Sequence, residues 1–98
     1  MKISNIFYFD PSDGIYDDHF PGNPVVPGSV IVSAFLKAGK ESGFSDEACI
    51  VEDFRFRGFV APGEHAFSIQ FVRDQMKCRL YQDNVDTSKT LVTGTIKR

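Results

Sequence analysis

The sequence predicts an α+β fold in which an antiparallel sheet packs against one helix. An apolar segment with helix-start signals lies early in the chain, at residues 29–40. Segments with strand character lie before and after it, separated by turns rich in Gly, Pro and Asp. Consecutive strands that turn back on themselves are typical of an antiparallel sheet. At 98 residues, the chain is expected to form a single domain covering residues 1–98.

Residues 2–9 are rich in Ile and aromatic side chains, and they predict the first strand. Residues 10–14 (DPSDG) then predict a turn. Pro27, Gly28 and Ser29 predict a helix start, because proline suits the first turn and a serine hydroxyl can cap unpaired amides. The helix at 29–40 is apolar on nearly all sides, as expected for a helix that a sheet wraps around.

After a polar loop at residues 41–47, the apolar period changes from helical to alternating. The segment at 48–60 places Phe54 and Phe56 on one face and Arg55 and Arg57 on the other. Two more alternating segments and a final strand at 90–97 follow. The inward side chains predicted for the alternating segments are Phe67, Ile69, Phe71, Met76, Cys78 and Leu80.

Composition limits the classes of function. Eleven basic against thirteen acidic residues give a net charge of −2, whereas nucleic-acid binding usually requires a basic excess. Cys49 and Cys78 lack the spacing of a metal site, and we expect two reduced thiols in a cytoplasmic protein. The longest mostly apolar stretch, Val25 to Leu36, has 12 residues, too few to span a bilayer. The first residues do not resemble a signal peptide.

The segment Asp17 to Phe35 (DDHFPGNPVVPGSVIVSAF) contains the chemistry-bearing residues. His19 lies in a loop with three prolines, and the loop leads directly into the helix. Amides at a helix start can polarise an acyl oxygen, and histidine is the usual general base near neutral pH. From the residues alone, an ordinary hydrogen-bonded or surface histidine is the alternative.

The run HFPGNPVVPG, from His19 to Gly28, resembles the HFPGxPxMPG signature of the hot-dog-fold β-hydroxyacyl-acyl-carrier-protein dehydratases of fatty-acid synthesis, with Val26 where methionine is common. FRFRGFVAPGE, from Phe54 to Glu64, resembles the FRxPVxPGD strand and turn of the same family. The resemblance covers roughly residues 15–97. It implies a hot-dog fold, with the sheet wrapped around one central helix, and at least a homodimer.

The resemblance also implies a dehydratase that acts on acyl thioesters in fatty-acid or related lipid or polyketide biosynthesis. His19 would move the Cα proton, and the backbone N–H of Gly28 would bind the thioester oxygen. The substrate would be carried on the phosphopantetheine of acyl-carrier protein or coenzyme A, so no cofactor of the enzyme's own is expected. Phe20 and Val30 would line the acyl pocket, with plain core positions as the alternative.

Ser33 occupies the position where the family has its acid, five residues after the motif glycine. In the family this acid protonates the departing hydroxyl and reaches the histidine of the other subunit. A serine hydroxyl is a poor proton donor, and loss of a placed general acid costs about 10²–10⁴ in rate. Nearby acids that could replace it are Asp17, Asp18, Glu41 and Glu64.

Three functions therefore remain open: a dehydratase that draws its acid from elsewhere, a thioesterase with water held between Ser33 and His19, and a non-catalytic acyl-binding or structural subunit. Such a subunit would complete its site with an acid-bearing partner chain. Arg55 and Arg57 are candidates to receive the acidic carrier protein or its phosphopantetheine phosphate. A solvated strand face is the alternative for these arginines.

Overall fold

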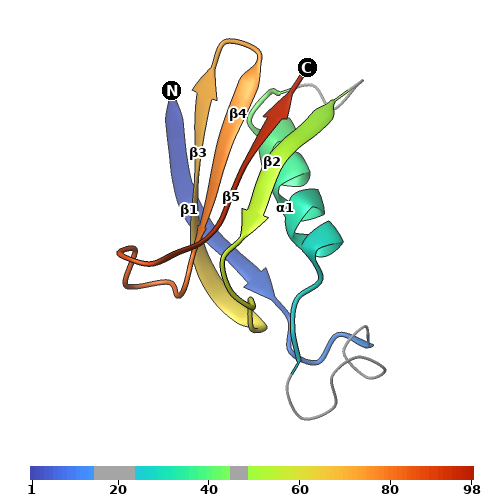
Figure 1. Cartoon of the computed structure of the whole chain (residues 1–98), viewed down its shortest axis with the longest axis vertical. Coiled ribbons are helices and arrows are strands. Elements are labelled where there is room, and N and C mark those ends of the chain that lie inside the picture. The colour runs from blue at the N-terminus through green and yellow to red at the C-terminus, as the bar shows by residue number, and fades with distance from the viewer. Residues whose placement is uncertain (15–23, 45–48) are drawn as a thin grey trace.

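A computed structural model describes residues 1–14, 24–44 and 49–98. The elements along the chain (Figure 1) are β1 (Lys2–Phe9), α1 (Gly28–Glu41), β2 (Ile50–Phe56), β3 (Gly63–Val72), β4 (Gln75–Tyr81) and β5 (Thr90–Lys97). The predicted α+β fold is confirmed, and the predicted bounds of the first and last strands match the structure. In the part of the chain that is described, no helix has the length and apolar character needed to cross a bilayer.

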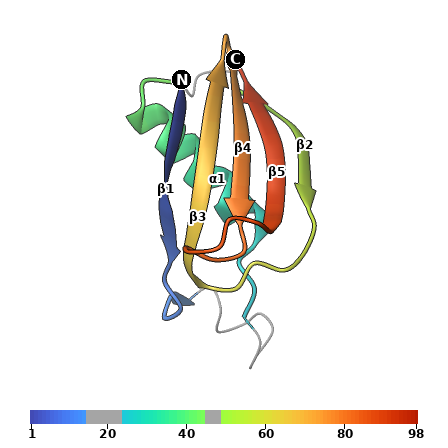
Figure 2. The same ribbon diagram turned by 90° about the vertical axis from the view of Figure 1, so that its left-hand side faces the viewer.

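The strands form one antiparallel five-stranded sheet in the order β1-β3-β4-β5-β2, so β1 and β2 are its edges. Helix α1 lies against one face of this sheet, which we call the inner face (Figure 1). The other, outer face is turned toward the viewer in Figure 2, where α1 lies behind the strands. The sheet therefore presents one face to the core and one face without a described element over it.

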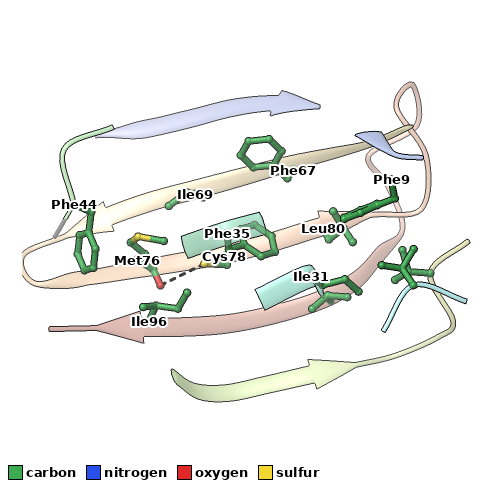
Figure 3. Close-up of a cluster of buried hydrophobic side chains, with 13 residues drawn as sticks. Phe9, Ile31, Phe35, Phe44, Phe67, Ile69, Met76, Cys78, Leu80 and Ile96 are labelled. Carbon is green, nitrogen blue, oxygen red and sulfur yellow. Dashed lines mark hydrogen bonds between the residues drawn. The ribbon is translucent and has the colours of Figure 1, made fainter. Parts of the chain in front are cut away.

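The core lies between α1 and the inner face (Figure 3). Phe35 of α1 has no exposed surface, and its ring meets those of Phe7 and Phe67 edge-on at 5.1 and 5.9 Å between centroids. Burial raises the pKa of the Cys78 thiol to about 12, so this cysteine stays protonated and packs as an apolar side chain. The predicted inward side chains are confirmed, with Phe71 half-buried and the other five buried.

Both ends of α1 are set by backbone hydrogen bonds. The carbonyl of Pro27 accepts the N–H groups of Val30 and Ile31 at 3.0 and 3.2 Å. The predicted serine cap is wrong, because the N-cap position is Pro27 and Ser29 lies inside the helix. At the other end, Gly43 takes a φ of +95°, a left-handed conformation that glycine adopts without steric cost.

A β-bulge interrupts β2. Glu52 pairs with Thr95 and Arg55 with Thr93, so Asp53 and Phe54 together stand opposite Gly94. Asp53 takes a φ of +53°, and the extra residue resets the alternation of the strand. Phe54 and Phe56 consequently lie on the same face, as predicted, and this is the inner face, while Arg55 faces outward.

Gly94 accommodates the bulge because it has no side chain. A Cβ at this position would lie 2.3 Å from the Phe54 ring. We predict that Gly94→Ala lowers the free energy of unfolding by about 1–3 kcal/mol, since overpacking a filled core costs this much. Urea denaturation measures the change.

The double variant Gly94→Ala with Phe54→Leu tests the cause. A smaller side chain at position 54 leaves room for the methyl group, so the two changes together should cost less than the sum of the single changes. If the losses of unfolding free energy are additive, the methyl group added by Gly94→Ala destabilises the protein through a contact other than the Phe54 ring.

Candidate active site

An apolar cavity of about 220 Å³ lies at the N-terminal end of α1. It is formed where the segment preceding α1 meets the end of β2 and the turn after it. The lining residues are Val25, Val26, Pro27, Gly28, Ile31, Phe56, Gly58, Phe59 and Val60. The two motifs quoted above, remote in sequence, thus meet at one site.

Two backbone contacts hold the cavity walls in place. The N–H of Val26 donates to the carbonyl of Val60 at 2.7 Å, which joins the residues before α1 to the turn after β2. The N–H of Arg57 donates to the carbonyl of Leu91 at 2.8 Å, which extends the pairing of β2 with β5. Both contacts are made by main-chain atoms, so the wall geometry follows from the sheet register.

Gly28 brings the helix start into contact with an aromatic ring. A Cβ at this position would lie 3.1 Å from Cζ of Phe56, so the ring would have to move by a few tenths of an ångström to admit a side chain there. The first turn of α1 contains no acidic residue, and the N-cap proline offers no side-chain acceptor. Among the described residues, neither the first turn of α1 nor its N-cap side chain therefore neutralises the positive end of the helix dipole at the cavity wall.

The structure places the predicted site residues in different environments. His19 and Phe20 lie outside the described residues. Gly28 lines the cavity. Val30 is half-buried against the core and Ser33 is exposed on α1, and neither belongs to the cavity wall.

Arg55 and Arg57 are exposed and belong to a different hollow. This groove of about 390 Å³ runs along β5 on the outer face, where Thr93 and Thr95 form part of its floor. Lys77 and Arg79 of β4 line the same groove. The structure thus groups the two arginines with other cations, on the face of the sheet opposite Phe56.

The described acids do not replace the missing family acid. Glu41 is the last residue of α1, and a rise of about 1.5 Å per residue puts it roughly 20 Å from Gly28. Glu64 begins the outer side of β3, where its Oε2 lies 3.5 Å from Nδ2 of Asn84. Asp17 and Asp18 lie outside the described residues.

His65 is a second histidine, to which the sequence analysis gave no role. The residue is 4% exposed, with Nδ1 2.9 Å from the carbonyl oxygen of Tyr81 and Nε2 2.7 Å from that of Ala61. A neutral imidazole carries one N–H and donates to one of these carbonyls at a time. Both ring nitrogens are occupied by the backbone, so His65 joins β4 to the turn before β3 instead of serving as a base.

Sequence reasoning missed the aromatic part of the cavity wall. Phe56 and Phe59 line the cavity and remain 47% and 81% exposed. The second motif could have indicated this wall, because Phe59 occupies the position where the family motif has a proline. Among the described residues, no cluster of His, Cys, Asp and Glu is suited to hold a metal ion.

Comparisons with known proteins agree with this arrangement. Residues 2–95 match the family model described as ApeI-like, the ApeI dehydratase. The chain is 31% identical over 90 residues to the 3-hydroxyacyl-acyl-carrier-protein dehydratase FabZ of Oenococcus oeni, covering 84% of this chain and 60% of that protein. It is 30% identical over 104 residues to FabZ of Herpetosiphon aurantiacus, covering 98% of this chain and 69% of that protein. The chain thus spans less than two thirds of the length of the Oenococcus relative.

A solved structure shares the fold. The dehydratase heterocomplex ApeI:P from Xenorhabdus doucetiae matches with a TM-score of 0.72 at 20% identity, and the match covers 98% of this chain and 85% of that chain. The predicted hot-dog fold, with one helix and an antiparallel sheet, is confirmed by this likeness.

We predict that the hydrogen bonds of His65 stabilise the cavity side of the sheet. His65→Phe keeps a buried ring but removes the N–H that the imidazole donates to the carbonyl of Ala61 or Tyr81, which should cost about 1–3 kcal/mol of unfolding free energy. His65→Ala should cost more, because it also removes the packed ring. Urea denaturation of both variants measures this, and wild-type stability of His65→Phe would contradict it.

Proposed function

Because the chain belongs to the ApeI-like dehydratase family, we propose that it acts on 3-hydroxyacyl thioesters and removes water to give 2-enoyl thioesters. The acyl group would be carried by acyl-carrier protein or coenzyme A, in fatty-acid or related lipid or polyketide biosynthesis. One observation supports this more than any other: an apolar cavity meets the uncapped start of α1 at Gly28.

The reaction needs a base, an oxyanion site and a proton donor. His19 would take the Cα proton, and the electron pair would move into an enolate-like thioester oxygen that the Gly28 N–H stabilises. The pair then returns to form the Cα–Cβ double bond as the hydroxyl leaves Cβ with a proton, as water. The apolar cavity wall would hold the acyl chain and exclude solvent from the developing charge.

The proton donor for the leaving hydroxyl is the missing part. Ser33 is exposed on α1 and away from the cavity wall, so its position is open to a second chain. We propose that an acid reaches the site from a partner. This leads to the second candidate function, in which the chain is a subunit that works with an acid-bearing homologue. The similar structure, ApeI:P, is a heterocomplex, which favours this candidate.

The β2 edge is the surface we propose for this association. Its unpaired side and the following turn expose apolar side chains, with Phe59 the most exposed among Ile50, Val51, Phe56 and Phe59. Edge strands pair readily with another chain, and two-fold pairing covers the same edge in both copies. A homodimer or a heterodimer with a homologue would both bury these side chains beside the cavity.

We also propose that Arg57, with Arg55 beside it, receives the acidic carrier or its phosphopantetheine phosphate. Arg57 immediately precedes Gly58, which lines the apolar cavity. A phosphate held there would sit at the edge strand, next to the end of the cavity that the acyl chain enters. The reduced state expected for Cys49 and Cys78 supports a cytoplasmic location.

A hydration assay tests the role of His19. The purified protein is mixed with an enoyl thioester, and loss of the conjugated thioester is followed by absorbance. His19→Ala should lower turnover by about 10²–10⁴, the usual contribution of a general base. Unchanged turnover in His19→Ala would contradict the proposed mechanism.

The same assay tests the missing acid. We predict that Ser33→Glu raises turnover of the protein on its own, while Ser33→Gln, of matched size but without an ionisable proton, does not. If the wild-type protein turns over only after an acid-bearing homologue is added, the subunit function is correct. If neither Ser33→Glu nor the added homologue gives turnover, both proposed functions are wrong.

A further inference from the structure

The outer face of the sheet has a charge pattern that the cavity does not use, and Arg55 is the one member of its rows to which the proposed function gives a role. In Figure 2 the five strands lie in front of α1, and no described helix or strand covers the near face. From the pattern described below, we infer that this face is an interface between two copies of the chain, packed back to back across a two-fold axis. The inference does not rest on the proposed function.

A row of uncharged residues crosses the middle of the outer face. Ile6 of β1 pairs with Ala66 of β3, and Ile6 is 44% exposed. Tyr81 continues the row on β4, since the pair next to it joins Phe67 and Leu80. The Tyr81 hydroxyl lies 3.1 Å from Oγ of Ser68, so its ring lies over the outer side of β3.

Basic residues lie on one side of this central row. The adjacent row crosses all five strands and consists of Ser4, Ser68, Arg79, Thr93 and Arg55. The row beyond it consists of Lys2, Gln70, Lys77, Thr95 and Glu52. Glu52 lies within these two rows and is neutralised by Lys97 at 2.7 Å. Asp53 of the bulge lies between the rows and lines the same groove, but Lys2, Arg55, Lys77 and Arg79 outnumber it. This half of the face is therefore positive.

Acidic residues lie on the other side of the central row. Glu64 begins the outer side of β3, and Asp83 follows the end of β4, with Asp86 further along the same loop. The Asp83 carboxylate accepts the N–H groups of Val85 and Asp86 at 2.9 and 2.6 Å. Hydrogen bonds from the Ser88 side chain and backbone lower the pKa of Asp86. The loop that contains Asp83 and Asp86 is thus held by hydrogen bonds between these carboxylates and its own backbone.

The two charged sides are equally spaced from the central row. On β3, Glu64 and Ser68 lie two residues to either side of Ala66, and Arg79 of β4 pairs with Ser68. A two-fold axis along the central row, in the plane between two facing sheets, therefore lays Glu64 of one copy over Ser68 of the other, beside Arg79. The same operation makes this contact twice, as an isologous interface requires.

The size of the face suits such a pair. Four spacings of about 4.8 Å between strands and eight residues of about 3.3 Å give a face of roughly 500 Å². Two such faces together bury on the order of 1,000 Å², the lower limit for a specific interface. The cations are spread over several strands, so they match a row of carboxylates better than a single phosphate.

The mass of the assembly in solution tests the inference. At low salt, we expect sedimentation equilibrium to give the wild-type protein twice the mass of Arg79→Glu. Salt at about 1 M should screen the charges and halve the wild-type mass. Arg79→Glu with Glu64→Lys should restore part of the doubled mass, because the charges again alternate across the axis. Lys37→Glu, the same charge reversal on exposed α1, should keep the wild-type mass.

Comparing wild type with Arg79→Glu keeps the measurement independent of pairing through the β2 edge, because that pairing contributes the same factor to both masses. Equal masses for the two proteins at low salt would overturn the inference. An acidic carrier protein that binds wild type but not Arg79→Glu, without any change of mass with salt, would show that the face serves the carrier instead.

A cysteine on the axis gives a second, position-specific test. Ala66 meets Ala66 of the other copy, so a short bismaleimide should cross-link Ala66→Cys into dimers across sheets about 10 Å apart. Ser4→Cys, which faces Tyr8 of the other copy instead of itself, should give no cross-link beyond the wild-type background. Failure of Ala66→Cys to cross-link would contradict the proposed axis even if the masses change with salt.

Discussion

The close approach of Phe54 to Gly94 sets the phase of β2, and both surfaces of functional interest depend on it. If the same residues formed β2 without a bulge, their side chains would alternate without interruption from Ile50 to Phe56. Phe56 would then turn outward and Arg55 inward. Gly94 on the neighbouring strand leaves room for the bulge. The bulge keeps the Phe56 ring beside Gly28 and the Arg55 side chain in solvent.

This single irregularity separates two kinds of chemistry across one sheet. On the inner side, apolar walls and an uncapped helix start favour an acyl chain and a developing negative charge. On the outer side, threonines of β5 lie low between longer basic side chains of β2 and β4. A register shift in β2 would therefore affect both faces at once, since one strand supplies a wall to each of them.

Much of this arrangement could be predicted from the sequence. Alternation identified the strands, and helix-start residues placed α1 within one residue of its bounds at each end, because both signals are local. The prediction of a serine cap is wrong because the helix begins one residue earlier, at Gly28. The carbonyl of Pro27 accepts the first hydrogen bonds of the helix. The bulge was not predicted, because it depends on the partner residue Gly94, about 40 positions away in the chain.

The candidate site was predicted only in part, for a related reason. The motif around Gly28 identified the helix end of the cavity, whereas Phe56 was predicted only to share one face of its strand with Phe54. Its contact with Gly28 requires the long-range pairing of β2 with β5, which alternation alone does not define. The role of Arg55 and Arg57 likewise depended on which other cations the sheet brings beside them, namely Lys77 and Arg79.

Under the proposed function, assembly and chemistry would be coupled at this site. A single chain leaves Phe56 and Phe59 exposed at the cavity and Ser33 in solvent, so water has access to the helix start that would stabilise an oxyanion. Covering the β2 edge with a second chain would remove that water and lower the local dielectric. The attraction between the Gly28 N–H and a developing charge would then strengthen. A partner would thus improve the oxyanion site whether or not it also supplies the acid, which gives a chain with a serine at position 33 a physical reason to pair.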